Sequence, residues 1–366
     1  MKQYSKFLFF SLLSLMLVAS SLPTADAAKL KPPTTSTTTP TAYTATTKSI
    51  LGYYVVYYTG DKTSYNSLYN YNSYLNEVST MTFDVTTTGA IAGTVPADGV
   101  SLANSKGVKA YAAVSNHGAG GAFDKDLARK VITDPVVRQT TINNILNLVK
   151  NNNYRGVNID FEDMYASDRP SYTQFISELA TTMRANGFST IVSVMAKTSD
   201  SPTSAWVGTF DYAALGQAAD KIQVMTYDEN GPWGAPGPVA SKPWVEKVIQ
   251  YTVSQIPSTK VLIGLPAYGY DWNTTAGTGK AVTWKSMPNL ISSTGATPQW
   301  DATAQSPYFT YKATDGTSHT VWYENSESIK VKTKLVNQYN LGGVSVWRMG
   351  LEDLSFWQAV TTGLSQ

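Results

Sequence analysis

The chain has 366 residues, enough for one large domain or two ordinary ones, and 42% of them are hydrophobic. Only 15% of the residues are charged, the formal net charge is +2, and lysine and arginine form no stripe, which argues against nucleic-acid binding. The sequence contains no cysteine, and this excludes disulfides and thiolate metal sites.

The first 28 residues have the organisation of a secretory signal peptide. Lys2 and Lys6 precede an apolar run over residues 7–18, and a small-residue cleavage signal ends at Ala27 and Ala28. We expect cleavage after one of these two alanines and a secreted protein, extracellular or associated with the cell wall. The apolar run is too short to span a bilayer and no later stretch approaches about 18 apolar residues, so no membrane anchor is expected.

Residues 29–48 are rich in threonine and proline, a composition that predicts a flexible or extended linker. Beyond it, short apolar runs predict strands over residues 50–57, 78–85, 108–114, 156–162, 190–195, 221–227, 260–266 and 343–347. Helical patterns lie between them at residues 134–150, 171–184, 243–255 and 326–338. This alternation predicts an α/β fold, a (β/α)8 TIM barrel over residues 49–366.

One interval is too long for an ordinary connection. Roughly sixty residues separate the seventh expected strand from the last expected helix, far more than a loop of this kind needs. Asp315 and Gly316 lie in this interval between two alternating segments, which is a strong hairpin signal. We expect a small α+β insertion over about residues 270–322, between strands seven and eight.

The segment 156–162 reads Gly-Val-Asn-Ile-Asp-Phe-Glu. Because side chains alternate along a strand, Asn158, Asp160 and Glu162 share one face and the apolar residues share the other. In a barrel the polar set points inward, where burial is costly without hydrogen bonds, and it lies at the strand end that carries barrel active sites. A solvated edge strand would show the same alternation, but a place in the fourth of eight strands favours a functional site.

The sixth expected strand repeats this design. Gln223, Met225 and Tyr227 share a face, and Asp228 follows at the end of the strand. A tyrosine in such a pocket can donate a hydrogen bond to a developing charge. A core tyrosine with a satisfied hydroxyl is the alternative for this residue taken alone.

Together these motifs resemble those of the family 18 glycoside hydrolases, which comprise chitinases and related N-acetylglucosaminidases. The resemblance covers about residues 50–357 and includes the acid motif of strand four, the motif from Met225 to Asp228, the insertion, and Trp347 in strand eight. Four stretches look closer to the bacterial branch that includes spore-cortex-lytic N-acetylglucosaminidases: residues 156–162, 264–272, 304–309 and 321–325.

The resemblance implies a retaining hydrolase that cleaves β-linked N-acetylglucosamine glycans by substrate-assisted catalysis. Glu162 would protonate the glycosidic oxygen while the substrate's own 2-acetamido carbonyl attacks the anomeric carbon. Asp160 would orient the acetamido nitrogen, and Tyr227 would hold the acetamido oxygen. Burial and the neighbouring Asp160 should raise the pKa of Glu162. The implied substrate-binding residues are Asn158, Asp228, Met225, Trp347 and Tyr54.

The chain departs from the family pattern at three places. Arg155 stands where the pattern begins with Asp, Asn158 replaces its middle Asp, and Ser115 and Asn116 stand where chitinases usually carry paired glycines. Asn158 can hydrogen-bond Asp160 but cannot share a proton with it, so we expect a pH profile unlike that of three-acid chitinases. The natural glycan stays open among peptidoglycan strands, chitin-type oligosaccharides and N-linked glycans.

Other functions have less support. His117 and His319 are the only histidines, too few for a histidine-rich metal site, and a Ser/His/Asp triad would need one of them. We expect no metal, no cofactor, and a monomer whose partner is an N-acetylglucosamine-containing glycan rather than nucleic acid or a membrane. A non-catalytic, lectin-like protein on the same barrel is the main alternative, and the presence of Glu162 argues against it. An interaction scaffold would need an obstructed barrel mouth.

Overall fold

The computed structural model describes residues 48–366, so the predicted signal peptide (1–28) and nearly all of the predicted linker (29–48) lie outside the described residues. Within the described range, eight parallel strands close into a barrel, because β1 pairs with β2 on one side and with β14 on the other. In order around the barrel they are β1 (Ser49–Val55), β2 (Glu77–Val85), β4 (Lys109–Ser115), β5 (Gly156–Asp160), β6 (Ser189–Met195), β7 (Lys221–Met225), β8 (Val261–Pro266) and β14 (Gly343–Trp347). The predicted (β/α)8 TIM barrel is confirmed.

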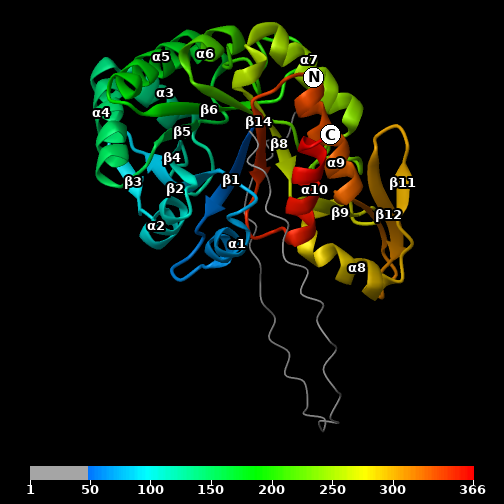
Figure 1. Cartoon of the computed structure of the whole chain (residues 1–366). Coiled ribbons are helices and arrows are strands. Elements are labelled where there is room, and N and C mark those ends of the chain that lie inside the picture. The colour runs from blue at the N-terminus through cyan, green and yellow to red at the C-terminus, as the bar shows by residue number, and fades with distance from the viewer. Residues whose placement is uncertain (1–47) are drawn as a thin grey trace, which may run out of the picture.

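Helices surround the strands on the outside of the barrel (Figure 1). They are α1 (Thr63–Tyr71), α2 (Ala97–Ser105), α3 (Lys125–Thr133), α4 (Pro135–Asn151), α5 (Arg169–Ala185), α6 (Tyr212–Ala218), α7 (Lys242–Gln255), α9 (Ser326–Gln338) and α10 (Leu354–Leu364). Helix α4 begins where the sequence predicts it, because the Asp134 carboxylate accepts hydrogen bonds from the N–H groups of Val136 and Val137 and Pro135 occupies the first turn. No helix within residues 48–366 is both long enough and apolar enough to cross a bilayer.

The apolar side chains of the barrel strands divide between two cores. The larger core lies between strands and helices and includes Val157, Ile159 and Phe161 around β5. The smaller core, inside the barrel, consists of Leu51, Tyr53, Tyr111, Ile191 and Leu262. Since successive residues of a strand face opposite sides, the smaller core fixes which residues of its strands look inward.

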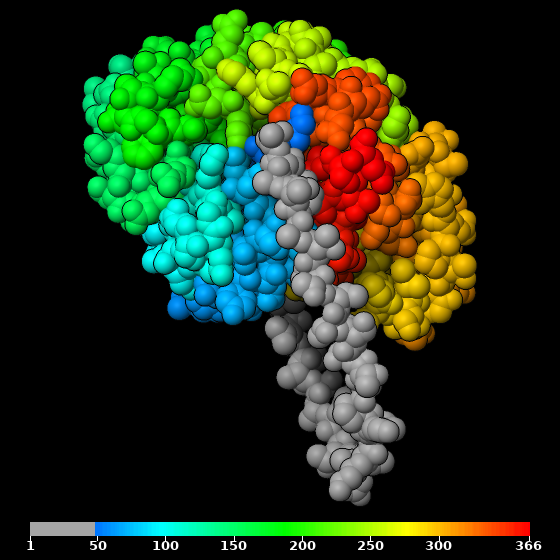
Figure 2. All heavy atoms as spheres, viewed as in Figure 1, coloured from blue at the N-terminus to red at the C-terminus, as the bar shows by residue number. Residues whose placement is uncertain are grey.

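The predicted insertion is a separate antiparallel sheet packed on a helix. Its elements are β9 (Tyr268–Asn273), β10 (Thr278–Thr283), α8 (Met287–Thr294), β11 (Gln299–Asp301), β12 (Ser306–Lys312) and β13 (Ser318–Trp322), and within the described residues the strand order is β10-β9-β13-β12-β11. The predicted hairpin joins β12 to β13, with Gly316 at φ 84° in its turn. In Figure 2 this segment forms a yellow to orange lobe at the side of the barrel. Only Ala267 separates β8 from β9, so the sheet is held close to the barrel mouth.

Strand β2 contains a bulge that the sequence does not reveal. Its register with β4 shifts between Met81 and Phe83, and the short strand β3 (Ile91–Gly93) pairs with it in the antiparallel direction. Beyond the bulge Phe83 packs in the outer core, while Asp84 lies opposite Ser115, whose hydroxyl it binds. A bulge reverses which residues of a strand face which side, and here it turns Asp84 toward the barrel interior.

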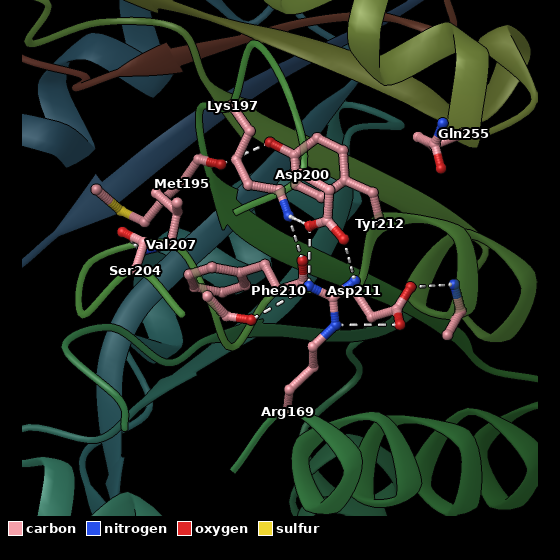
Figure 3. A network of polar contacts seen from close by, with 12 residues as sticks. Arg169, Met195, Lys197, Asp200, Ser204, Val207, Phe210, Asp211, Tyr212 and Gln255 are labelled. Atoms are coloured by element: carbon pink, nitrogen blue, oxygen red, sulfur yellow. Dashed lines mark hydrogen bonds and ion pairs between the residues drawn. The ribbon is translucent and has the colours of Figure 1, made fainter. Parts of the chain in front are cut away.

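An ion-pair network holds the long connection between β6 and α6 (Figure 3). The buried Lys197 ammonium donates to Asp200 (2.9 Å) and to the carbonyl oxygen of Phe210 (2.6 Å), while Arg169 of α5 binds both Asp200 and Asp211. Hydrogen bonds from Arg169, followed by those from Lys197, hold the pKa of Asp200 at about 2. The connection is therefore fastened to the first turn of α5 beside the barrel mouth.

Candidate active site

The end of β5 carries the predicted acid motif into the barrel mouth. Asp160 closes the strand, and Glu162 follows it with a half-buried side chain. The side chain of Asn116 clamps the main chain of Glu162: its oxygen accepts from the Glu162 N–H (2.9 Å), and its nitrogen donates to the Glu162 carbonyl oxygen (3.0 Å). Asn116 is fully buried, so it fixes the point from which the Glu162 side chain projects. Sequence reasoning noted Asn116 only as a departure from the family pattern.

Asn158 lies deeper in the barrel and joins several strands. Its side-chain oxygen accepts hydrogen bonds from the hydroxyls of Tyr53 (2.8 Å) and Ser79 (3.1 Å), and its nitrogen donates to Ser193 (3.0 Å). Asn158 is fully buried, and none of these bonds goes to Asp160. Asn158 does not hydrogen-bond Asp160, because its amide is already engaged inside the barrel, and its place among the substrate-binding residues stays a prediction. Asn158 positions β5.

Burial raises the pKa values of both carboxyl groups at the mouth. The pKa of Asp160 rises to about 6, mainly through burial, with His117 nearby acting in the opposite direction. The pKa of Glu162 lies well above its usual range, first because of burial and then because of the negative charges of Asp160, Asp228 and Asp163. The negative charge of Asp160 thus adds to burial in favouring the protonated form of Glu162.

Tyr227, just beyond the end of β7, also faces the mouth. Burial, and then the charges around it, raise the pKa of its hydroxyl far above the usual value. That hydroxyl makes no hydrogen bond to any residue from 48 to 366 and can donate one to a ligand. Gly264 of β8 leaves room for the ring, because a Cβ atom there would stand 2.5 Å from it. Met225, two residues earlier, is buried in β7 opposite Met195 of β6.

Asp228 connects the barrel mouth to the inserted sheet. Its Oδ1 atom accepts hydrogen bonds from the hydroxyls of Tyr268 (2.6 Å) and Tyr270 (2.8 Å), both on β9. Burial raises the pKa of Asp228, and the two hydroxyls partly oppose that rise. Sequence reasoning missed both tyrosines, although their alternation along β9 was the signal that could have revealed them.

Trp347 closes the barrel interior from β14. It packs against the inner core, and its ring meets the ring of Tyr53 edge to face at 5.4 Å between centroids. The expectation that Tyr54 lines the pocket is wrong, because Tyr54 belongs to the outer core and its ring lies against Gly99 of α2. Tyr53 is the inward tyrosine of β1, with its hydroxyl on Asn158.

A cluster around His117 lies next to the acid motif and was not expected. His117 Nδ1 lies 2.9 Å from Asp84 Oδ1 and 2.7 Å from the Ser115 hydroxyl, and that hydroxyl also donates to Asp84 (2.5 Å). A Ser/His/Asp triad needs the serine and the aspartate on opposite nitrogens of the ring. Here both lie at Nδ1, so the cluster is not a nucleophilic triad.

The described residues thus place at the barrel mouth a carboxyl whose protonated form is favoured by burial and by neighbouring negative charges, a second buried carboxyl with a pKa of about 6, and an unengaged tyrosine hydroxyl. Two neighbouring carboxyl groups with raised pKa values are suited to acid–base hydrolysis, and they lie at the end of the barrel where enzymes of this fold act. Fold and site define a barrel hydrolase.

Comparisons with known proteins identify the kind of hydrolase. The model of the Glycosyl hydrolases family 18 matches residues 49–352. The uncharacterized glycosylase YvbX of Bacillus subtilis is 38% identical over 323 residues, which are 88% of this chain and 94% of that protein. Two solved structures are similar: a chitinase from Chromobacterium violaceum (37% identity, TM-score 0.82, 87% of this chain and 99% of that one) and the spore cortex-lytic enzyme SleL of Bacillus megaterium (27%, TM-score 0.80, 86% and 73%). The chain belongs to the glycoside hydrolases of family 18, as its motifs indicate.

Proposed function

We propose that this hydrolase is a secreted, retaining enzyme that cleaves β-linked N-acetylglucosamine glycans with the help of the substrate's own acetamido group. The observation that carries the proposal is the pair Asp160 and Glu162, two residues apart at the barrel mouth, where burial raises the pKa values of both carboxyl groups. The similarity to a chitinase and to a spore cortex-lytic enzyme supports glycans of chitin or cortex type as substrates.

Glu162 is the proton donor in this mechanism. It protonates the glycosidic oxygen, and the bond to the anomeric carbon breaks as the acetamido oxygen forms a new bond to that carbon. Asp160, as an anion, accepts a hydrogen bond from the acetamido N–H and stabilises the positive charge of the resulting oxazolinium. Glu162 then takes a proton from a water molecule. The water oxygen bonds to the anomeric carbon as the bond from that carbon to the acetamido oxygen breaks, so the product retains the anomeric configuration.

The remaining residues hold the reacting sugar. Tyr227 donates its unengaged hydroxyl to the acetamido oxygen, and Asp228 fixes the adjoining part of the inserted sheet through Tyr268 and Tyr270. Trp347 forms an apolar floor under the sugar ring, with Met225 beside it.

Product analysis with Glu162→Gln tests the proposal. Purified peptidoglycan, soluble chito-oligosaccharides and a high-mannose glycopeptide are each incubated with the wild type and with the variant. We expect a loss of about 10³-fold or more on the preferred substrate, because general acid catalysis contributes roughly 10² to 10⁴ and the same residue acts in both steps. Proton NMR of the first products should show the β-anomer.

Asp163→Asn is the matched control, since it removes the neighbouring charge, which is paired with Lys125 at 3.0 Å on the surface. It should keep most of the activity. Full activity in Glu162→Gln would refute the mechanism, and an α-anomer as first product would refute retention. Binding without turnover on all three substrates would favour the lectin-like alternative.

Secretion is a separate part of the proposal and is supported by the leader pattern of residues 1–28. Mass spectrometry of the protein from culture medium should give a mature chain that starts at residue 28 or 29. A cell-retained chain of full length would contradict this part alone.

A further inference from the structure

Asp160 is a buried carboxyl without a direct charged partner. No ion pair within residues 48–366 includes it, and its burial favours the neutral form. In the family pattern that the sequence resembles, another inward acid stands at the position of Asn158, and here the amide of Asn158 cannot share a proton with Asp160. A hydrogen bond from Ser193 favours the ionised form of Asp160, and a positive charge nearby favours it further if Asp160 is to stabilise a cationic intermediate.

The side chains that can supply this effect lie on β4, which neighbours β5, and on β2 beyond it. Ser115 of β4 is the register partner of Asp160 on one side and of Asp84 on the other, so the three residues form a row across β2, β4 and β5. Asp84 joins this row only because the bulge after Met81 turns it inward. Adjacent strands lie about 4.8 Å apart, which puts Asp84 roughly 10 Å from Asp160 in the row.

His117 sits above this row and is firmly held. Its Nδ1 atom lies 2.9 Å from Asp84 and 2.7 Å from Ser115, and its ring stacks on Phe123 at 4.3 Å between centroids. Hydrogen bonds from His117 and Ser115, and the charge of His117, lower the pKa of Asp84 although burial alone would raise it. These contacts therefore favour the ionised form of Asp84.

We propose that His117, held by Asp84, is a positioning residue that keeps Asp160 ionised for its contact with the acetamido group, in place of the acid that Asn158 lacks. The inference rests on the proposed function, because it assigns Asp160 a role in that mechanism. The other charged groups near His117 are already occupied. Asp124 caps α3 through the N–H groups of Asp126 and Leu127, and Lys125 pairs with Asp163.

The test measures kcat against pH on a fluorogenic chitobioside for three variants. In His117→Gln, Asp160 loses a positive neighbour and faces the unpaired anion of Asp84, so the pKa of Asp160 rises. We expect the acid limb of the profile to move up by about one pH unit, because the uncompensated charge of Asp84 about 10 Å away has an effect of that size at an effective dielectric constant near 20. Activity near pH 5 then falls up to about tenfold, and activity near pH 8 stays close to that of the wild type.

The double variant Asp84→Asn with His117→Gln removes both charges and should bring the acid limb at least halfway back. A loss of packing around the ring would not be repaired by a second substitution, so this recovery separates an electrostatic role from a structural one. His319→Gln is the matched control. His319 binds Asp271 (2.7 Å) and Tyr311 (3.1 Å) in a similar cluster on the inserted sheet and should leave the acid limb in place.

Two results would overturn the inference. An acid limb that stays in place in His117→Gln would show that the residue does not act on Asp160, and a rise in KM alone would assign it to sugar binding. Failure of the proposed function looks different, since the wild type itself would then release no product or Glu162→Gln would remain active. Circular dichroism on each variant confirms that the fold is retained.

Discussion

Glu162, the proposed proton donor, is difficult to ionise in the folded protein. Burial and three neighbouring carboxylates raise its pKa well above the value that the unfolded chain would have. Such a group destabilises the fold once the pH exceeds its unfolded pKa, because the unfolded chain can ionise while the folded chain cannot. The proposed proton donor therefore lowers the stability of the folded protein at neutral pH.

Glu162→Gln should consequently raise the melting temperature at pH 7–8. The sign follows from linkage: the stabilising contribution of a group with a raised folded pKa is complete below about pH 4 and lost as the pH rises. We expect a gain of about 2–4 °C at pH 8 that disappears at pH 4. Differential scanning calorimetry at both pH values measures it, with Asp163→Asn as the control that should shift less, because Asp163 is paired with Lys125 and makes the smallest of the three charge contributions to the Glu162 pKa. A gain of the same size at pH 4 would point to packing instead.

For single residues, the sequence predicts well which way polar side chains of the barrel face, and it predicts poorly which way aromatic side chains face. The alternation around Asp160 and Glu162 identifies the inward face of β5, since only that face is polar. Strand β1 is buried on both faces, so nothing in its composition shows that Tyr53 and not Tyr54 looks inward. The contacts of Asn158 were equally hidden, because Tyr53, Ser79 and Ser193 come from three distant segments.

At the scale of elements, the bulge in β2 decides which side chains reach the site. Its geometry depends on β3, where Gly93 adopts φ 116° directly against the bulge. A Cβ atom at Gly93 would lie 2.0 Å from the carbonyl oxygen of Thr82, so no other residue fits there without displacing the main chain. The displaced main chain is the one that carries Asp84.

Gly93→Ala should therefore lower the free energy of unfolding by more than backbone strain alone explains. Gly107, at φ 74°, has open space around its missing side chain and serves as the control. We expect Gly107→Ala to cost about 1–2 kcal/mol through the left-handed conformation, and Gly93→Ala to cost about 3 kcal/mol or more. Urea unfolding measures both. Gly93→Ala should also lose activity at low pH, as His117→Gln does, and equal effects of the two substitutions would contradict this account.

The barrel strands and four of the helices were predictable from the sequence, whereas α1, α2, α3, α6 and α10 lie outside the predicted helical ranges, and the irregular elements were not predicted either. The eight barrel strands and helices such as α4 follow from local pattern and capping, and the hairpin of the insertion follows from Asp315 and Gly316. The bulge and β3 depend on pairing with β4 and on one close contact at Gly93, neither of which leaves a periodic signal. The position of the inserted sheet depends on Asp228, whose partners are forty or more residues away.

At the scale of the whole molecule, two sets of carboxyl groups make the stability of the fold depend on pH in opposite directions. Among residues 48–366, the pKa is raised, chiefly by burial, for Asp160, Glu162, Asp228, Glu229, Glu324 and Glu352. It is lowered, chiefly by hydrogen bonds and ion pairs, for Asp61, Asp84, Asp98, Asp134, Glu178, Asp200, Glu246 and Asp315. The first set loses its stabilising contribution as the pH rises above about 4, and the second loses it as the pH falls below about 4.

The melting temperature should therefore pass through a maximum near pH 5 and decline toward pH 8, on the acid side of the range in which many proteins are most stable. Thermal scans in steps from pH 3 to pH 9 at constant ionic strength measure the profile. The fall below pH 4 should weaken with added salt for the exposed pairs such as Lys62 with Asp98, whereas the decline above pH 5 should persist because the groups responsible are buried. A melting temperature that still rises between pH 5 and pH 8 would mean that the active-site carboxyls ionise freely in the folded enzyme, and the assignment of Glu162 as a proton donor would lose its physical basis.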